Sequence, residues 1–378
     1  MIITGIEIWP VRVPYKSAYT TSRGTVRHAE GVVVRIVTDT GLAGLGEASF
    51  LFPDRSGETV ETVPLILERR LGPLLLGADP LDIDGALGLL DRACCEQYSF
   101  PYSRAALDIA LHDIKAREQD VPVAVLLGGV QRPRLAVGRS LPITPPDELV
   151  ACAVALREQG YRGLTLKGSA DWRADVERFL AVRRAVGDEF PLEIDPNQAY
   201  SVEDAVAVVT ALEPHGLANL EQPCAWWDLE GMARVTAATS VTVAADESVM
   251  CSADVAMVAR MRAANMVTIK LARVGGISEG VRMVEVARAA GLECNMGSKH
   301  TFGIGTAAIL HFCASVGHVS EPIGYGSPLE RFADDVIRED ICLANGFATV
   351  PDGPGLGVTL DEDKLCRYTV GARLKVHA

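Results

Sequence analysis

The sequence lacks the features that mark a nucleic-acid-binding, membrane-spanning or secreted protein. It has no long basic block, and its net charge of −13, from 36 basic and 49 acidic residues, argues against nucleic acid or anionic membrane as a partner. No apolar run reaches the ~18 residues that a membrane span needs. Residues 1–15 alternate like a strand and have neither a basic n-region nor a small-residue cleavage site. We therefore expect a cytoplasmic protein.

Paired cysteine spacings are also absent. The nine cysteines are scattered along the chain, and an odd count without pairing predicts reduced thiols rather than a disulfide framework. Cys152 and Cys313 lie in apolar stretches that are predicted to be helical. Cys94 and Cys95 are adjacent and lack the CxxC spacing of a metal or redox pair, so we interpret them as buried helix residues.

The first third of the chain predicts an α+β domain, residues 1–129. Three runs read as strands of an antiparallel meander: 2–13, 31–38 and 42–47. Three later stretches are predicted helices: 61–71, 80–95 and 103–118. Residues 15–29 are rich in Ser, Thr and Gly and are long for a tight hairpin, so they predict a flexible loop of the kind that often forms a lid. Gly128-Gly129 and Pro133 mark the boundary.

The next part of the chain, residues 130–350, predicts a parallel β/α barrel. Polar or charged residues recur every 24 to 28 positions, each after a short apolar run: Lys167, Asp195, Glu221, Asp246, Lys270, Asn295 and Glu321. The first strand is expected at 135–140. Amphipathic segments between these positions each fit one helix: 172–186, 202–213, 229–238, 252–263, 278–290 and 303–316. Residues 351–370 are loop-like and carry three closely spaced glycines, and residues 351–378 are expected to return to the first domain.

Asp195, Glu221 and Asp246 follow three consecutive predicted strands. The carboxyl ends of barrel strands carry the chemistry, so these side chains should converge. Three carboxylates cannot sit together ionised without a cation, and an oxygen-only, incomplete ligand set suits Mg²⁺, or Mn²⁺ in its place. The alternative, a set of helix caps and surface acids, would suit any single acid better than it suits three in register.

Lys167 and Lys270 bracket the acids on the second and sixth predicted strands. A lysine near other cations has a lowered pKa and can act as a base. Two such lysines would address opposite faces of a substrate. A lysine at a strand end is more often a surface residue, but the symmetry about the acids favours a catalytic pair.

The motifs together resemble the muconate lactonizing enzyme subgroup of the enolase superfamily. The matching segments are Leu164–Lys167, Ile194–Gln198, Leu220–Pro223, Ala245–Ser248, Ile269–Gly276, Leu107–Asp113 and Gly353–Gly357. The resemblance implies a (β/α)7β barrel with an α+β capping domain. It also implies Mg²⁺ on Asp195, Glu221 and Asp246, and acid/base catalysis by Lys167 and Lys270 through an enediolate.

Other residues of the same motifs and loops are candidates for contacts with the substrate or the metal ligands. Asn197 and Glu247 would support the metal ligands. Further candidates come from the strand ends and the first-domain loops: Thr165, Lys299, His300, Glu321, Tyr19 and Phe50. A solvated loop is an equal interpretation of the Lys299-His300 pair.

The sequence departs from the subgroup in two places. The usual Lys-x-Lys of the second strand is Thr165-Leu-Lys167 here, which puts the tuning of Lys167 in question. The eighth strand, Val319–Ile323, lacks the Asp-x-Asp of dipeptide epimerases. The loss of a positive charge at Thr165 suits a substrate that carries its own ammonium.

We therefore expect a small, amino-acid-like carboxylate as substrate and a homo-oligomeric enzyme. Dehydration of a cis-3-hydroxy-L-proline type of substrate, or epimerisation of a proline derivative, fits two opposed lysines. Open alternatives are a muconate-type cycloisomerase, an N-acyl amino acid racemase or dipeptide epimerase, and a sugar-acid dehydratase. A catalytically inactive barrel used for binding would have lost some of these acids or lysines, and all five are present.

Overall fold

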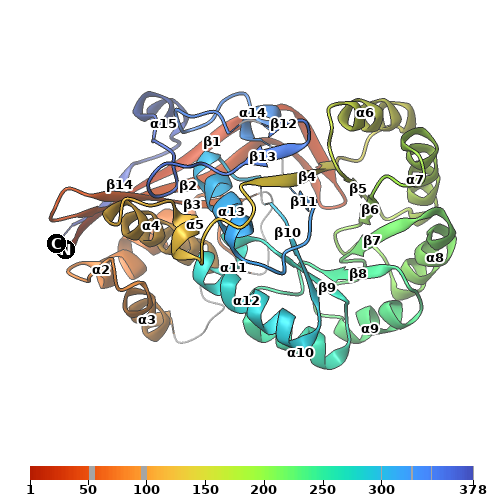
Figure 1. Ribbon diagram of the computed structural model, residues 1–378, viewed down its shortest axis with the longest axis horizontal. Coiled ribbons are helices and arrows are strands. Elements are labelled where there is room, and N and C mark those ends of the chain that lie inside the picture. Colours follow the sequence, from red (N-terminus) through yellow and green to blue (C-terminus); the bar gives the residue numbers. More distant parts are fainter. Residues whose placement is uncertain (51–55, 95–99, 299, 325–326, 342, 378) are drawn as a thin grey trace.

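The computed structural model describes residues 1–50, 56–94, 100–298, 300–324, 327–341 and 343–377. Figure 1 shows a sheet with its helices on the left and a barrel on the right, with both chain ends on the sheet side. This arrangement confirms the predicted α/β barrel with an α+β capping domain. We keep 1–129, 130–350 and 351–378 as the proposed division of the chain.

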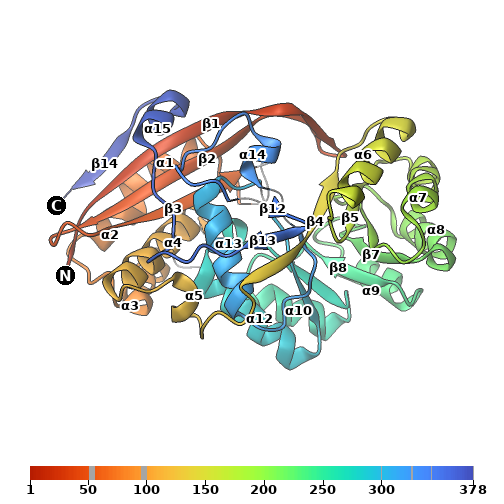
Figure 2. The same ribbon diagram turned by 45° about the horizontal axis from the view of Figure 1, so that its top comes forward.

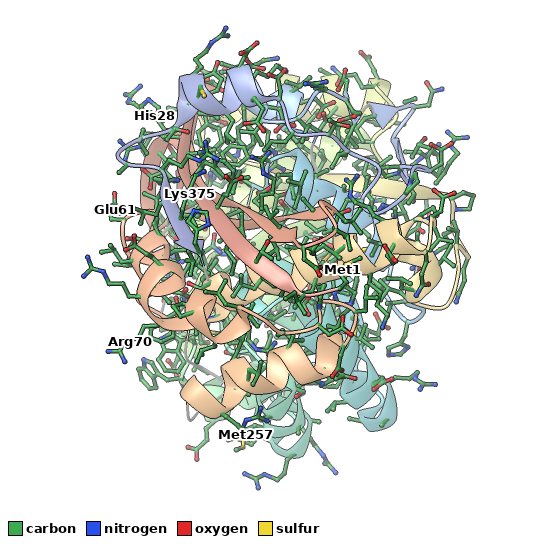
Figure 3. The ribbon with its side chains drawn as sticks, turned by 90° about the vertical axis from the view of Figure 1, so that its left-hand side faces the viewer. Met1, His28, Glu61, Arg70, Met257 and Lys375 are labelled. Carbon is green, nitrogen blue, oxygen red and sulfur yellow. The ribbon has the colours of Figure 1, made fainter. Side chains whose placement is uncertain are left out.

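The capping domain is an antiparallel sheet covered by helices. Its strands run in the order β14-β1-β2-β3: β14 (Leu374–His377), β1 (Ile3–Thr21), β2 (Gly24–Thr38) and β3 (Ala43–Phe50). The helices follow β3 in the chain: α1 (Thr62–Ile66), η1 (Leu67–Leu71), α2 (Gly72–Leu75), α3 (Ile83–Cys94), α4 (Pro101–Glu118) and α5 (Val123–Leu126). In Figure 3, Glu61 and Arg70 point away from the molecule, whereas Leu67 and Leu71 are buried against the sheet.

Helix α4 packs on the sheet so closely that two β3 residues must be glycine. A Cβ on Gly46 would lie 1.8 Å from the carbonyl oxygen of Ala106, and one on Gly44 would lie 2.3 Å from that of Ala110. The same strand contacts the barrel, because the buried Glu47 accepts hydrogen bonds from the backbone N–H of Phe302 and Gly305, both at 2.7 Å. Strand β3 therefore fixes the capping domain to the start of a barrel helix.

The prediction of a flexible loop at residues 15–29 is wrong. Strands β1 and β2 continue through it as one long hairpin, in which Tyr19 pairs with Val26 and Thr21 with Gly24. Threonine and tyrosine favour extended structure, and Gly24, at φ 131°, accommodates the tight turn. Figure 2 shows this hairpin extending from the capping sheet to the barrel near β4 and α6.

The barrel is closed by parallel strands in sequence order. Its strands are β4 (Arg134–Leu141), β5 (Leu164–Lys167), β6 (Leu192–Asp195), β7 (Leu217–Glu221), β8 (Thr242–Ala245), β9 (Met266–Ile269), β10 (Glu293–Met296) and β11 (Ile323–Gly324). The helices between them are α6 (Pro146–Glu158), α7 (Trp172–Val186), α8 (Val202–Leu212), η2 (Glu213–His215), α9 (Leu229–Ala237), α10 (Ser252–Met261), α11 (Leu271–Val274), α12 (Ile277–Ala290) and α13 (Gly303–Ser315). The repeat of strand and helix follows the predicted spacing within a few residues.

The position of Glu321 differs from the prediction. It precedes β11 instead of ending it, because Pro322 has no N–H to donate to a ladder and the strand begins at Ile323. Its carboxylate pairs with Arg132 at 3.2 Å and accepts from the N–H of Ala136 at 2.8 Å. Glu321 therefore lies at the N-terminal end of the barrel strands and outside the candidate site.

The C-terminal part of the chain joins the two layers. It contains α14 (Pro328–Arg331), β12 (Leu343–Ala344), β13 (Phe347–Thr349), α15 (Glu362–Tyr368) and the edge strand β14. β13 pairs with β4 of the barrel, and β14 pairs with β1 of the capping sheet. Residues 351–370 were expected to be loop-like, but they contain the helix α15. Asp361 caps this helix by accepting hydrogen bonds from the N–H groups of Asp363 and Lys364.

Six cysteines of the described residues have free thiols and form no disulfide: Cys152, Cys224, Cys251, Cys294, Cys313 and Cys366. Cys152 and Cys313 lie in helices α6 and α13 as predicted; Cys313 is buried and Cys152 is exposed. The side chains of Cys94 and Cys95 lie outside the described residues. Within the described part of the chain, no helix is both long and apolar enough to cross a membrane.

Candidate active site

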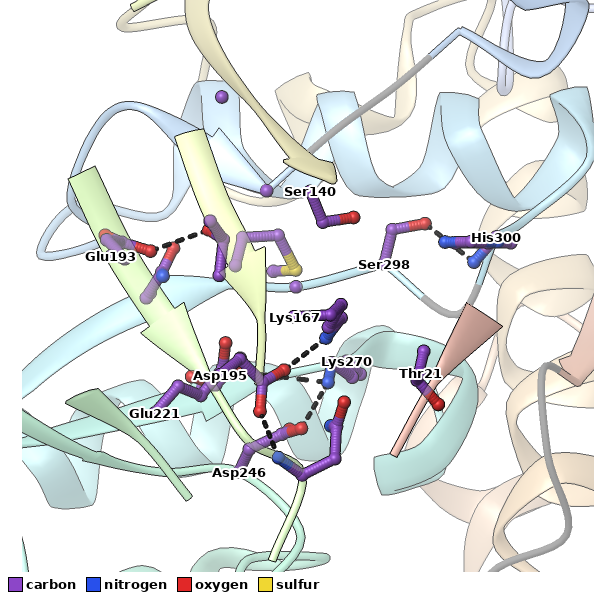
Figure 4. Close-up of a pocket in the computed structure, with 18 of the residues that line it drawn as sticks. Thr21, Ser140, Lys167, Glu193, Asp195, Glu221, Asp246, Lys270, Ser298 and His300 are labelled. Carbon is purple, nitrogen blue, oxygen red and sulfur yellow. Dashed lines mark hydrogen bonds and ion pairs between the residues drawn. The ribbon is translucent and has the colours of Figure 1, made fainter. Parts of the chain in front are cut away.

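One cavity lies where the barrel strands end and the tip of the β1–β2 hairpin meets them. Its lining includes all five predicted metal and catalytic side chains, namely Lys167, Asp195, Glu221, Asp246 and Lys270. Thr21 from the hairpin and Ser298 after β10 lie on its far side in Figure 4. The predicted convergence of these strand ends is thus present in the fold.

The three carboxylates are deeply buried. Asp195 and Asp246 are fully buried, and Glu221 is nearly so. Burial, followed by the negative charges of Asp195 and Asp246, raises the pKa of Glu221 well above its usual range. The three carboxylates therefore carry more negative charge than Lys167 and Lys270 beside them neutralise.

Each lysine forms an ion pair with one of the acids. Lys167 pairs with Asp195 and Lys270 pairs with Asp246, while Lys270 Nζ lies 4.0 Å from Glu221 Oε1. Burial acts to lower the pKa of Lys167, but the charges of Asp195, Tyr19 and Glu221 outweigh it and the pKa is raised. As it stands, Lys167 is held as an ammonium by its acidic neighbours.

Arg273, which the sequence analysis did not single out, is a third cation at this site. Its side chain is 1% exposed, and it donates to both the Oδ1 and the backbone oxygen of Asp246 at 2.7 Å. Burial opposes ionisation of Asp246, but Arg273 and Lys270 together hold its pKa well below the usual range. The residue lies within the Ile269–Gly276 motif, so the signal was present in the sequence.

Neighbouring side chains fix the orientation of the acids. The backbone N–H of Asn197 donates to Asp195 Oδ1 at 2.8 Å, and its side-chain amide donates to Glu247 at 3.1 Å. Gln222 is fully buried, and its amide oxygen accepts from the N–H of Asp246 at 2.8 Å. These contacts agree with the supporting role predicted for Asn197 and Glu247.

Aromatic side chains from the hairpin and from the loop after β10 pack together beside the cavity, and Tyr19 and His300 line it. The Tyr15 hydroxyl and His300 Nδ1 are 2.6 Å apart, and the Tyr19 hydroxyl is hydrogen-bonded to Ser140 at 2.9 Å. The rings of Tyr19 and His300 pack edge to face at 4.6 Å. Burial, with nearby Arg331 and Arg139, lowers the pKa of His300 well below its usual value, so this imidazole is neutral at pH 7.

The other predicted contact residues have different outcomes. Tyr19, His300 and Thr165 line the cavity, and Glu321 does not, as described above. Lys299 and the side chain of Phe50 lie outside the described residues. The solvated-loop interpretation of His300 is wrong, since this side chain is 5% exposed.

The residues present fit a divalent metal by donor chemistry. Within the described part of the chain, no three His, Cys, Asp or Glu side chains are spaced to hold an ion, and Asp195 and Asp246 are each paired with a lysine. The donors are all carboxylate oxygens, which Mg²⁺ prefers. The pKa of Glu221 is raised, and among the described residues the buried Oε2 of Glu247 has no hydrogen-bond partner. Both observations indicate a site that accepts more positive charge.

Two protein-family models match nearly the whole chain. The model described as "Mandelate racemase / muconate lactonizing enzyme, N-terminal domain" matches residues 3–128, and "Enolase C-terminal domain-like" matches residues 148–364. The chain belongs to the mandelate racemase/muconate lactonizing enzyme family of the enolase superfamily. Members of this superfamily bind Mg²⁺.

Relatives of this family member are isomerases of more than one kind. N-succinyl-L-Arg/Lys racemase of Bacillus cereus is 29% identical over 98% of each chain, and its crystal structure superposes with a TM-score of 0.94 over 100% of both chains. Muconate cycloisomerase 1 of Rhodococcus opacus is 32% identical over 97% of this chain and 98% of its own. A dipeptide epimerase of Enterococcus faecalis, solved with Mg and L-Leu-L-Tyr, has 27% identity and a TM-score of 0.88 over 95% of this chain and 100% of its own. These relatives share proton-abstraction chemistry.

Proposed function

We propose that the protein is a Mg²⁺-dependent racemase or epimerase of a small, amino-acid-like carboxylate. The observation that carries the proposal is the placement of Lys167 and Lys270 at the ends of β5 and β9, on either side of the three acids of β6, β7 and β8. Relatives that are racemases and epimerases support this reaction class.

The roles follow from what each side chain can do. When bound to Asp195, Glu221 and Asp246, Mg²⁺ would neutralise the substrate carboxylate and the negative charge that develops on it. One lysine in its neutral form removes the α-proton. The other, as an ammonium, delivers a proton to the opposite face, so the net change is inversion at carbon with no loss of atoms.

Two features of the site suit proton transfer by the lysines. The charge of Asp195 raises the pKa of Lys167, and neutralising the acids would remove this effect. Tyr19 and His300 are buried and line the cavity, and apolar ring surface beside the lysines strengthens electrostatic interactions there.

Elimination of water remains a second candidate because the same arrangement permits it. One lysine would take the α-proton while the other protonates a leaving hydroxyl on the opposite face. This was the dehydration predicted from the sequence for a cis-3-hydroxyproline type of substrate. Thr165 brings no positive charge where the subgroup usually has a lysine, and this suits a substrate with an ammonium group, such as a hydroxyproline.

The test is a screen in deuterated buffer with Mg²⁺. The panel contains N-acyl amino acids, dipeptides, proline derivatives including cis-3-hydroxy-L-proline, a sugar acid and muconate. We expect α-deuterium incorporation with inversion for an amino-acid-like compound, and Lys375→Ala, on the distant strand β14, serves as the lysine control. Turnover of muconate or the sugar acid alone would contradict the proposed substrate class, and loss of water would select the dehydratase.

A further inference from the structure

A further cavity lies beside the active site, and we call it the second cavity. Residues of strand β1, the end of β4, helix α6 and the short helix α14 line it; Figure 2 shows the end of the hairpin next to β4 and α6. Its volume is about 290 Å³, many times the ~10–15 Å³ that one water molecule needs. Tyr19, Ser140 and Arg331 line both this cavity and the active site, so they form the partition between the two.

Arg331, the last residue of α14, is a buried cation without an anion. It is 8% exposed, its Nε has no hydrogen-bond partner, and no carboxylate of the described residues pairs with its guanidinium. Burial, followed by the positive charge of Arg139, lowers the pKa of Arg331 to about 10, so it remains charged at pH 7. A buried charge without a partner costs free energy. Packing alone therefore does not account for an arginine at this position.

The other charged residues that line the second cavity already have partners or lie in water. Arg139 pairs with Glu330 at 3.1 Å, and Glu330 also accepts a hydrogen bond from the Tyr161 hydroxyl. Glu148 is exposed in the first turn of α6, where water solvates its charge. Among the described residues of this lining, Arg331 is thus the cation that remains open to an anionic ligand.

Much of the remaining wall is apolar. It comes from the end of β4 and from one side of α6: Leu141, Pro142, Leu149 and Leu156. An occupant that pairs with Arg331 would lay the rest of its surface against these side chains. A carboxylate suits the planar guanidinium because its two oxygens match two parallel N–H groups. A short aliphatic chain on that carboxylate would cover the apolar wall, which inorganic phosphate would leave uncovered.

We propose that the second cavity is a ligand site, separate from the catalytic site, that binds a small aliphatic carboxylate. The carboxylate accepts hydrogen bonds from the guanidinium of Arg331, and its aliphatic chain packs against Leu141, Leu149 and Leu156. The ligand is held unchanged, so no bond forms or breaks. The inference does not depend on which reaction the catalytic site performs.

Cys152 provides a local probe of the second cavity. It lines the cavity and is exposed on α6, whereas Cys366 is exposed on α15 and does not line it. The full-length protein with Mg²⁺ is alkylated with iodoacetamide, which is uncharged, and mass spectrometry of the peptides follows each thiol separately. We expect butyrate to slow the alkylation of Cys152 severalfold and to leave Cys366 unchanged. Butyramide, its uncharged isostere, should need about 10- to 100-fold higher concentration for the same protection, since it lacks a charge-assisted hydrogen bond.

Arg331→Met removes the proposed cation with little change in volume. Butyrate should then protect Cys152 no better than butyramide does. Without ligand, this variant should unfold at the same or a higher urea concentration than wild type, because a buried charge without a partner is removed. Arg157→Met, at an exposed position of α6, is the control and should leave the protection unchanged. A marked loss of stability in Arg331→Met would show that the protein itself supplies a partner, and it would overturn the inference.

The remaining outcomes separate the second cavity from the catalytic site. A carboxylate in the proposed catalytic site would bind through Mg²⁺, so protection of Cys152 that disappears with a chelator would overturn the inference. Equal protection by butyramide or by inorganic phosphate would contradict an aliphatic carboxylate as the ligand, and no protection by butyrate would exclude the site. Protection by butyrate both with Mg²⁺ and with a chelator, lost in Arg331→Met, would support it.

Discussion

Replacing Arg273 by methionine tests the electrostatic account of the site most simply, because it does not require a substrate. The guanidinium is 1% exposed and donates twice to Asp246 at 2.7 Å. Removing one partner of a buried ion pair costs about 3–5 kcal/mol. Lys270 remains as a second cation for Asp246, so we expect a smaller loss than this range, about 2–3 kcal/mol of unfolding free energy.

The assay is urea denaturation at neutral pH with a chelator present, so that no metal contributes to stability. A double-mutant cycle of Arg273→Met with Asp246→Asn should give a coupling energy of at least about 1.5 kcal/mol. Arg282→Met is the control, since Arg282 is a half-exposed arginine on α12 paired with Glu279, and it should cost no more than about 1 kcal/mol. Equal losses for the two arginines, or a coupling energy near zero, would refute the reasoning.

Three further predictions concern the metal, the pH dependence of stability and packing. Asp246→Asn should lower Mg²⁺ affinity in calorimetry by more than the ~10- to 100-fold typical of an outer-shell change; unchanged affinity would remove Asp246 from the metal site. Burial raises the pKa of Glu47 to about 7 from an ordinary 4.5, so its contribution to stability is complete below about pH 4.5 and about 3 kcal/mol is lost as pH rises through 7. Urea titrations should show Glu47→Gln flattening this dependence, and an unaltered slope would contradict it. Gly46→Ala should destabilise by more than about 3 kcal/mol because its Cβ would meet Ala106, whereas Gly41→Ala, with open space around it, should cost about 1 kcal/mol from its positive φ; equal melting temperatures would count against the close packing of α4.

The regular part of the fold was predictable because each strand end carries a polar residue after an apolar run. The spacing alone placed Lys167, Asp195 and Glu221 at the last positions of β5, β6 and β7. It failed at Glu321, where Pro322 delays the start of β11. Spacing cannot account for a residue that lacks a backbone donor.

The hairpin and Glu193 show what local patterns miss. Residues 15–29 have loop-like composition, but pairing across β1 and β2 stabilises an extended chain that composition does not predict. Glu193 alternates with Asp195 on β6 and so faces the same interior, a signal that was present in the sequence. Its hydrogen bond from the Thr165 hydroxyl across the β5–β6 ladder depends on the strand register, which the residue spacing does not give.

The most direct test of the central claim is the facial selectivity of α-proton exchange in the two lysine variants. With the best substrate of the panel, each enantiomer is incubated in deuterated buffer with Mg²⁺ and either Lys167→Ala or Lys270→Ala enzyme. If the lysines serve opposite faces, racemisation falls by about 10²–10⁴ or more in both variants, and each variant exchanges the α-proton of only one enantiomer, a different one in each case. Exchange of the same enantiomer by both variants, or near-normal racemisation by either, would contradict the account.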